Sequence, residues 1–186
     1  LRHSPGALDA SVAGDTVLVA PGVYTDVETR DIAGLGSWTS CVFMVDGVVL
    51  RSEGGAAQTL IDMQDSPGPQ PCVLNALYLN SGSTSVQGFT FTGAPVNSQG
   101  VFTAFGALVT FRDCVFRDLD AGESGGAGIA ANTDLLLERC EFVNCVASGG
   151  GALYHANGRL WMYDCVFREC GSIAALVRGN PGGPVE

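Results

Sequence analysis

The sequence contains no lysine: its nine basic residues are all arginine, and nineteen acidic residues give a net charge of −10. A surface of this charge repels phosphate backbones, so nucleic acid is excluded as an expected partner. No apolar run approaches the roughly 18 residues that cross a bilayer, and no membrane span is predicted. Acidity of this kind suits a secreted protein, a high-salt habitat, a Ca²⁺-binding surface or plain solubility.

Helical periodicity is also scarce. No copy of the repeat described below keeps apolar residues at the spacing i, i+3, i+4, i+7, which argues against leucine-rich and helical solenoids. The 26 glycines and 8 prolines recur between short apolar segments, so they indicate turns between strands. The composition therefore predicts an all-β chain, with residues 1–186 forming a single domain.

One nine-residue pattern recurs along the second half of the chain. Its copies cover residues 86–94, 111–119, 137–145 and 162–170, and their starts lie 25, 26 and 25 residues apart. Short strands with this period cannot bury an apolar face alone, but stacking them about 4.8 Å apart gives each strand a parallel partner. The repeat predicts a right-handed parallel β-helix of about six coils.

This register places like residues above one another. We expect a column of stacked aromatic rings, a neighbouring column that is mostly cysteine, and an asparagine ladder at one turn. A stacked asparagine tolerates unusual backbone angles and can hydrogen-bond the next coil through its amide. The members are Phe91, Phe116, Phe142 and Phe167; Phe89, Cys114, Cys140 and Cys165; and Asn132, Asn157 and Asn180.

The two ends of the predicted solenoid differ from its middle. Residues 5–13 predict a short helix that caps the first coil, residues 14–180 hold the coils, and residues 181–186 form a tail. Residues 26–44 and 63–72 are predicted to be loop excursions. Prolines in the tail can blunt the last strand edge; otherwise a neighbouring domain or a second copy would cover it, and end-to-end stacking of copies generates fibres.

The seven cysteines fall into two groups. Five lie in columns that face inward, where cysteine behaves as a small hydrophobe and where parallel Cβ vectors suit a disulfide poorly. We predict buried free thiols for these five, and no metal site, because their spacing follows from the coil itself. Cys41 and Cys72 lie outside the columns and are the candidate disulfide, which would imply an oxidising compartment.

Outward charged residues supply the weak catalytic candidates. Asp113, Arg139 and Asp164 share one column, and Arg168 lies in another. A polysaccharide lyase would need carboxylates to hold Ca²⁺ or neutralise a uronate, and an arginine or lysine base. Charge pairing between neighbouring strands explains the same alternation without catalysis. We therefore expect no cofactor, except Ca²⁺ if the chain is a lyase.

Aromatic residues and histidine offer two further readings. Tyr154, Trp161 and Tyr163 are candidates for a carbohydrate-stacking platform, and support of the coil by surface aromatics explains them equally well. His155 falls in the column of Ala130, which predicts an outward, exposed side chain. It has no partner at metal-site spacing.

The segment Gly14-Asp-Thr-Val-Leu-Val-Ala-Pro-Gly-Val-Tyr24 resembles the opening coil of right-handed parallel β-helix proteins of the pectin-lyase-like superfamily. The Cys-x-Phe-x-x-Cys and Gly-Gly-Ala elements are similar to repeats of bacterial surface β-helix proteins, including the polymorphic outer-membrane type. The likeness covers most of residues 5–180. It implies the fold more than an activity, because this architecture hosts lyases, hydrolases, epimerases, adhesins and tailspikes.

We therefore expect a non-enzymatic β-helix module, extracellular or at the cell surface, that serves structure, adhesion or filament-like self-assembly. Its expected partners are carbohydrate, a neighbouring domain or another copy of itself. The alternative is a polysaccharide-active enzyme, such as a calcium-assisted uronate lyase.

Overall fold

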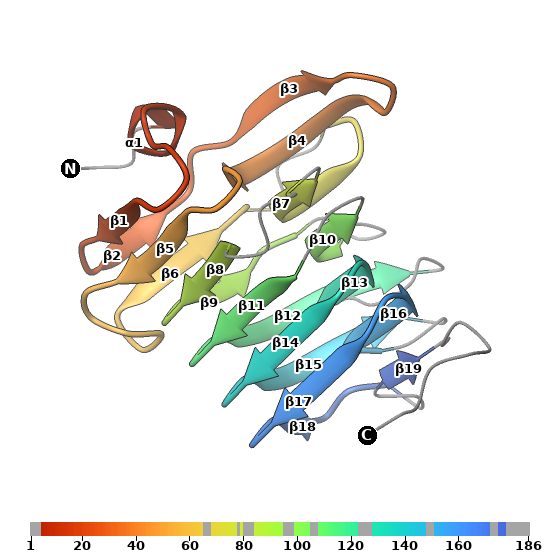
Figure 1. Ribbon diagram of the computed structural model, residues 1–186. Coiled ribbons are helices and arrows are strands. Elements are labelled where there is room, and N and C mark those ends of the chain that lie inside the picture. The colour runs from red at the N-terminus through yellow and green to blue at the C-terminus, as the bar shows by residue number, and fades with distance from the viewer. Residues whose placement is uncertain are drawn as a thin grey trace.

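The computed structural model describes residues 5–64, 68–77, 79, 84–94, 99–104, 108–122, 128–147, 151–171 and 175–177. Within these ranges three sheets wind around a common interior as a parallel β-helix (Figure 1). All strand pairs are parallel except one hairpin near the N-terminus. The prediction of an all-β parallel β-helix is confirmed.

Each coil contributes strands to three sheets. In spatial order, the first sheet holds β1 (Thr16–Val19), β5 (Val49–Ser52), β8 (Thr84–Gln87), β11 (Val109–Arg112), β14 (Leu135–Glu138) and β17 (Leu160–Tyr163). The second holds β2 (Gly22–Tyr24), β6 (Thr59–Asp62), β9 (Thr90–Thr92), β12 (Val115–Gly122), β15 (Glu141–Ala147) and β18 (Val166–Arg168). The third holds β3 (Glu28–Ile32), β4 (Gly36–Phe43), β7 (Pro71–Leu77), β10 (Gln99–Ala104), β13 (Ile129–Asn132), β16 (Leu153–Asn157) and β19 (Ala175–Val177).

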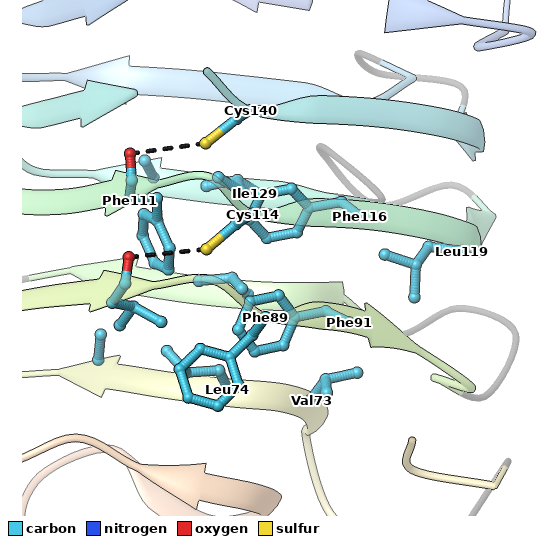
Figure 2. Packing of buried hydrophobic residues seen from close by; sticks show 14 of the residues in the cluster. Val73, Leu74, Phe89, Phe91, Phe111, Cys114, Phe116, Leu119, Ile129 and Cys140 are labelled. Carbon is cyan, nitrogen blue, oxygen red and sulfur yellow. Dashed lines mark hydrogen bonds between the residues drawn. The ribbon is translucent and has the colours of Figure 1, made fainter. Parts of the chain in front are cut away.

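The predicted aromatic column fills the interior behind the second sheet. Phe116 pairs with Phe142 between β12 and β15, and Phe142 pairs with Phe167 between β15 and β18. The ring centroids are 5.3 Å apart for Phe91 and Phe116, and 4.8 Å apart for each of the next two pairs. Cys114 and Cys140 lie beside these rings on successive coils, as predicted (Figure 2).

Two columns of residues form tight corners with left-handed backbone. At the turn between the first and second sheets, φ is 52° for Asp113, 50° for Arg139 and 53° for Asp164, where Gly88 stands one coil earlier with 75°. A side chain at such an angle costs roughly 1–2 kcal/mol, and the coil tolerates it because the flanking strands fix the turn. The second column consists of Gly93, Asp118, Asn144 and Glu169.

The asparagine ladder is present in part. The Asn157 side-chain amide donates a hydrogen bond to Oδ1 of Asn132 on the preceding coil. Neither residue has positive φ, whereas the neighbouring Gly158 does, at 93°. The unusual backbone angles expected at the asparagines therefore belong to other positions. Asn180 lies outside the described residues.

The prediction of a loop across residues 26–44 is wrong. β3 and β4 form an antiparallel hairpin, and β4 then continues in parallel beside β7 (Figure 1). A second apolar cluster of Trp38, Phe43 and Cys72 lies apart from the main core, with Ile32 and Leu35 packed against it. This cluster gives the hairpin an apolar face to bury, which is the physical reason for strand structure there.

A short helix, α1 (Pro5–Asp9), lies at the N-terminal end of the solenoid (Figure 1). Leu8 packs against the core, and Asp9 forms an ion pair with Arg30 of β3 at 2.9 Å. The predicted cap is thus confirmed, with a helix that ends at Asp9 rather than Ala13. Across the described part of the chain, no helix has the length and hydropathy needed to cross a membrane.

Candidate functional site

The outward corner column brings Asp113 and Arg139 together. Arg139 donates from Nε and Nη2 to the two carboxylate oxygens of Asp113, at 2.7 and 2.9 Å. This bidentate contact lowers the pKa of Asp113 and raises that of Arg139. Asp164, on the next coil, adds to the negative field at Arg139. Because the guanidinium is held in its charged form, it is a poor candidate for a catalytic base.

Arg168 lies apart from this column, on β18 in the second sheet, and pairs with Glu141 of β15 at 3.3 Å. Further pairs of the same kind join Arg112 to Glu138 and Arg159 to Asp134. Each pair connects one coil with the next. The four catalytic candidates are therefore divided between two columns, and the charges around them are arranged as ion pairs between neighbouring strands.

The three aromatic candidates do not form one platform. Trp161 and Tyr163 lie on β17 in the first sheet, whereas Tyr154 lies on β16 in the third. The Arg159 guanidinium stacks over the Trp161 ring, 5.0 Å from its centroid. One face of the indole is therefore already occupied, while Tyr163 remains 55% exposed.

The predicted disulfide between Cys41 and Cys72 is not formed, because both residues are buried free thiols. Cys41 packs in the main core, whereas Cys72 belongs to the separate cluster under the hairpin. The side chains thus pack in different clusters although their strands are neighbours. Burial raises the pKa of each thiol to about 12, which makes both unreactive.

The cysteine columns contain free thiols, as predicted, but the burial predicted for all five holds for three. Cys114, Cys140 and Cys145 are buried, whereas Cys165 and Cys170, on the last coil, are half-buried. The Cys140 thiol has three acceptors in reach: the carbonyl oxygens of Phe111 at 3.5 Å (Figure 2) and of Glu138 at 3.6 Å, and the Cys165 sulfur. A hydrogen bond from Cys140 lowers the pKa of Cys165 to about 7 and raises that of Cys140. Cys165 is therefore the thiol poised to ionise near neutral pH.

The prediction of an exposed His155 is wrong, since its side chain is fully buried. The strand register shifts between β13 and β16, so that His155 pairs with Ala131 rather than Ala130. An extra residue, Ala156, restores the match of Asn132 with Asn157. The inward ring places Nε2 2.9 Å from the Thr133 carbonyl oxygen. The sequence signal for this bulge was the change of spacing between the two strands, from 24 residues for Ala131 and His155 to 25 residues for Asn132 and Asn157.

A cavity of about 90 Å³ lies beneath α1, inside the first coil. Its walls are mainly apolar, with Glu28 and Arg30 among the lining residues. The sequence does not predict this cavity, because the cavity is interior volume that no side chain fills. Small-molecule sites usually enclose roughly 300–1,000 Å³, so this space is a gap under the cap and is too small for a sugar-binding cleft.

These features define the class of protein: a parallel β-helix whose outward charges are used in contacts between coils. No group of three or more metal-ligating side chains gathers at one point in the described ranges. Comparison with protein-family models, with curated proteins and with solved structures finds no match to this chain.

Proposed function

We propose that this chain is a non-enzymatic structural module of an extracellular or cell-surface β-helix. The observation that carries the proposal is the pairing of its outward charges from coil to coil, best seen at Asp113 and Arg139. The similarity of the Cys-x-Phe-x-x-Cys and Gly-Gly-Ala elements to repeats of bacterial surface β-helix proteins supports a surface or extracellular setting.

The same pairing argues against the lyase alternative. A lyase base must lose its proton and approach the substrate, whereas Arg139 is held charged by both oxygens of Asp113. A long polysaccharide also needs an open cleft beside the base. The cavity beneath α1 lies at the end of the solenoid, and it is far smaller than a sugar-binding site requires.

A structural role uses what the coils do provide. Stacked coils form a stiff rod with a long outer surface, and each coil depends mainly on its neighbours. Ion pairs between coils fix the register at the surface, while the aromatic column fixes it in the interior. The excess of acidic residues keeps such a rod hydrated and separate from other anionic polymers.

The decisive experiment measures turnover and binding on the same protein. Purified protein is incubated with pectate and with alginate, with and without Ca²⁺, and unsaturated uronate products are followed by ultraviolet absorbance. We expect no product. Turnover that disappears in Arg139→Ala or Arg168→Ala, but persists in the control Arg51→Ala on the same outer surface, would establish the lyase instead.

Glycan-array binding provides the second readout. Binding without turnover, reduced by Tyr163→Ala, would specify an adhesive form of the proposed module. A structural module without adhesion binds none of the arrayed glycans, and its Arg139→Ala variant differs from the parent chain only in stability.

A further inference from the structure

The turn that follows β16 is bound to the turn that follows β13 on the preceding coil. The side-chain amide of Asn157 donates a hydrogen bond to Oδ1 of Asn132. Two residues further on, Arg159 donates from its backbone nitrogen to Oδ1 of Asp134 at 2.7 Å and from Nη2 to Oδ2 at 2.8 Å. Corresponding residues of the two turns therefore contact each other on both sides of the residue between them.

That middle residue, Gly158, cannot be replaced without strain. Its φ is 93°, in the left-handed region that favours glycine. A Cβ at this position would lie 2.5 Å from the carbonyl carbon of Thr133 and 2.7 Å from the backbone nitrogen of Asp134. Both are backbone atoms of the preceding turn, so neither can move aside easily. The stacking of the coils thus requires a glycine directly after Asn157.

The pair Asn157-Gly158 is the single Asn-Gly sequence in the chain. Asparagine is chemically labile when the following backbone nitrogen can reach its side-chain carbonyl carbon. A following glycine favours this approach, because it has no Cβ to obstruct the nitrogen. The other asparagines in the described ranges are Asn75, Asn132 and Asn144, which precede alanine, threonine and cysteine.

The surroundings of Asn157 leave it open to reaction. Both Asn157 and Gly158 are exposed to solvent, so water and hydroxide reach them. The hydrogen bond to Asn132 holds the side-chain nitrogen that would depart as ammonia. A single hydrogen bond between exposed neutral groups adds little to stability, because water can replace it. The bond therefore slows a rotation of the side chain without preventing it.

We propose that Asn157 is a site of spontaneous deamidation in the folded protein. The Gly158 nitrogen loses its proton to hydroxide and attacks Cγ of Asn157. A new C–N bond forms, the bond from Cγ to Nδ2 breaks, and the nitrogen leaves with a proton from water as ammonia. Water then opens the resulting five-membered succinimide at either of its two carbonyl carbons. The sum of the steps is asparagine plus water giving aspartate or isoaspartate plus ammonia.

The two products differ in what they do to the contact between the coils. Either one adds a negative charge to a chain whose net charge is already −10. An aspartate at position 157 can still accept a hydrogen bond if Asn132 turns its amide. An isoaspartate lengthens the main chain by one carbon directly before Gly158, which has no free space against Thr133. The isoaspartate form should therefore loosen this turn more. The inference goes beyond the proposed structural function and does not depend on it.

The test follows the full chain during prolonged incubation at neutral and at mildly alkaline pH. Peptide mass spectrometry locates a gain of one mass unit, and an isoaspartate-specific methyltransferase detects the second product. We expect modification at Asn157, with a rate that rises with pH because the Gly158 nitrogen must lose a proton. Asn144 is the internal control: it is exposed and donates to Asp118 of the preceding coil at 3.0 Å, but no glycine follows it. It should react at least tenfold more slowly.

Two variants test the geometry, after circular dichroism establishes that each keeps its β-structure. Asn132→Ala removes the acceptor of the Asn157 amide and should raise the rate at Asn157 several-fold. Asn157→Gln should abolish the modification, because its side chain would have to close a larger ring. In the parent chain, the isoaspartate fraction should unfold at lower urea concentration than the unmodified fraction.

Equal rates at Asn157 and Asn144 would overturn the inference. So would a folded chain that stays unmodified while the same chain in urea reacts at Asn157. An unchanged rate in a folded Asn132→Ala would overturn the role given to the hydrogen bond. If Asn132→Ala does not fold, the comparison of the native and urea-unfolded parent chain decides the question. None of these results bears on turnover of pectate or alginate, so the proposed function stands or falls separately.

Discussion

The rings of Phe142 and Phe167 stack face to face, with centroids 4.8 Å apart and planes inclined by 4°. Phe116 continues the stack on the other side of Phe142 at the same separation. Phe142 therefore has an aromatic neighbour on each face, whereas Phe167 ends the column. The contribution of a ring to stability should depend on this position.

Phe142→Ala should lower the free energy of unfolding by about 3–5 kcal/mol, the usual cost of removing a buried phenylalanine. Phe167→Ala should cost less, because that ring is only half-buried. Urea unfolding followed by circular dichroism gives both values, and Phe142→Leu is the control that keeps most of the apolar volume. Equal losses at the two positions would contradict a continuous column.

Cys165 should be alkylated by iodoacetamide in preference to the other thiols. Its rate should reach half of its maximum near pH 7, because the hydrogen bond from Cys140 lowers the pKa of Cys165 to about 7 and only the thiolate reacts. Peptide mass spectrometry at low protein concentration measures the rate. Cys140→Ala should move the midpoint to higher pH, and Cys170→Ala should leave it unchanged.

A midpoint near 8.5, the value for an isolated cysteine, would contradict the shared hydrogen bond.

Acid should weaken the fold through Asp113 and Asp134, whose pKa values are lowered. At Asp113 the main cause is the hydrogen bond from Arg139; at Asp134 partial burial acts in the opposite direction and hydrogen bonds from Arg159 outweigh it. A carboxyl with a lowered folded-state pKa stabilises the fold above its unfolded value of about 4 and loses that effect as pH falls through the folded value. The urea concentration at the unfolding midpoint should therefore decrease once the pH is lowered below about 4.

The matched variants are Asp113→Asn and Asp134→Asn. Each should lower the urea midpoint slightly at pH 7 and make its decline in acid shallower. Asp164→Asn, at the corresponding corner of the last coil, serves as the control. An acid decline as steep in both variants as in the parent chain would show that these carboxylates are not its source.

His155→Leu should destabilise the fold by about 1 kcal/mol, because it removes the hydrogen bond to the Thr133 carbonyl while keeping an apolar body in a buried position. Urea unfolding measures the change, with Asn157→Ala on the exposed side of the same turn as the comparison. In the folded protein His155 should also resist diethylpyrocarbonate and react only in urea. Rapid modification in native buffer would contradict its burial.

The sequence predicts those parts of the fold that keep the period of the coil. Phe116, Phe142 and Phe167 recur at nearly constant spacing, so their contact follows from the repeat alone. His155 breaks that spacing by one residue, and a shift of one residue moves a side chain to the other face of a strand. A pattern compared at fixed spacing cannot show such a bulge.

Other features lie outside the repeat. The hairpin of β3 and β4 occurs once, so no second copy indicates that its residues pair. The register predicts that Asp113, Arg139 and Asp164 share a column, and the ion pair of Asp113 with Arg139 follows from it. The cavity beneath α1 depends on how a helix of five residues seats on the first coil, and no local pattern encodes that volume.

The register between coils also determines how the protein can be made. Phe142 meets Phe116 just 26 positions behind it in the chain, and the other parallel pairs join segments at comparable separations. During synthesis, each new strand can pair with a strand of the preceding coil that has already left the ribosome. Its pairing does not require the C-terminal part of the chain. The solenoid can therefore fold one coil at a time. A chain truncated after a complete coil would keep the preceding coils and expose one unpaired strand edge.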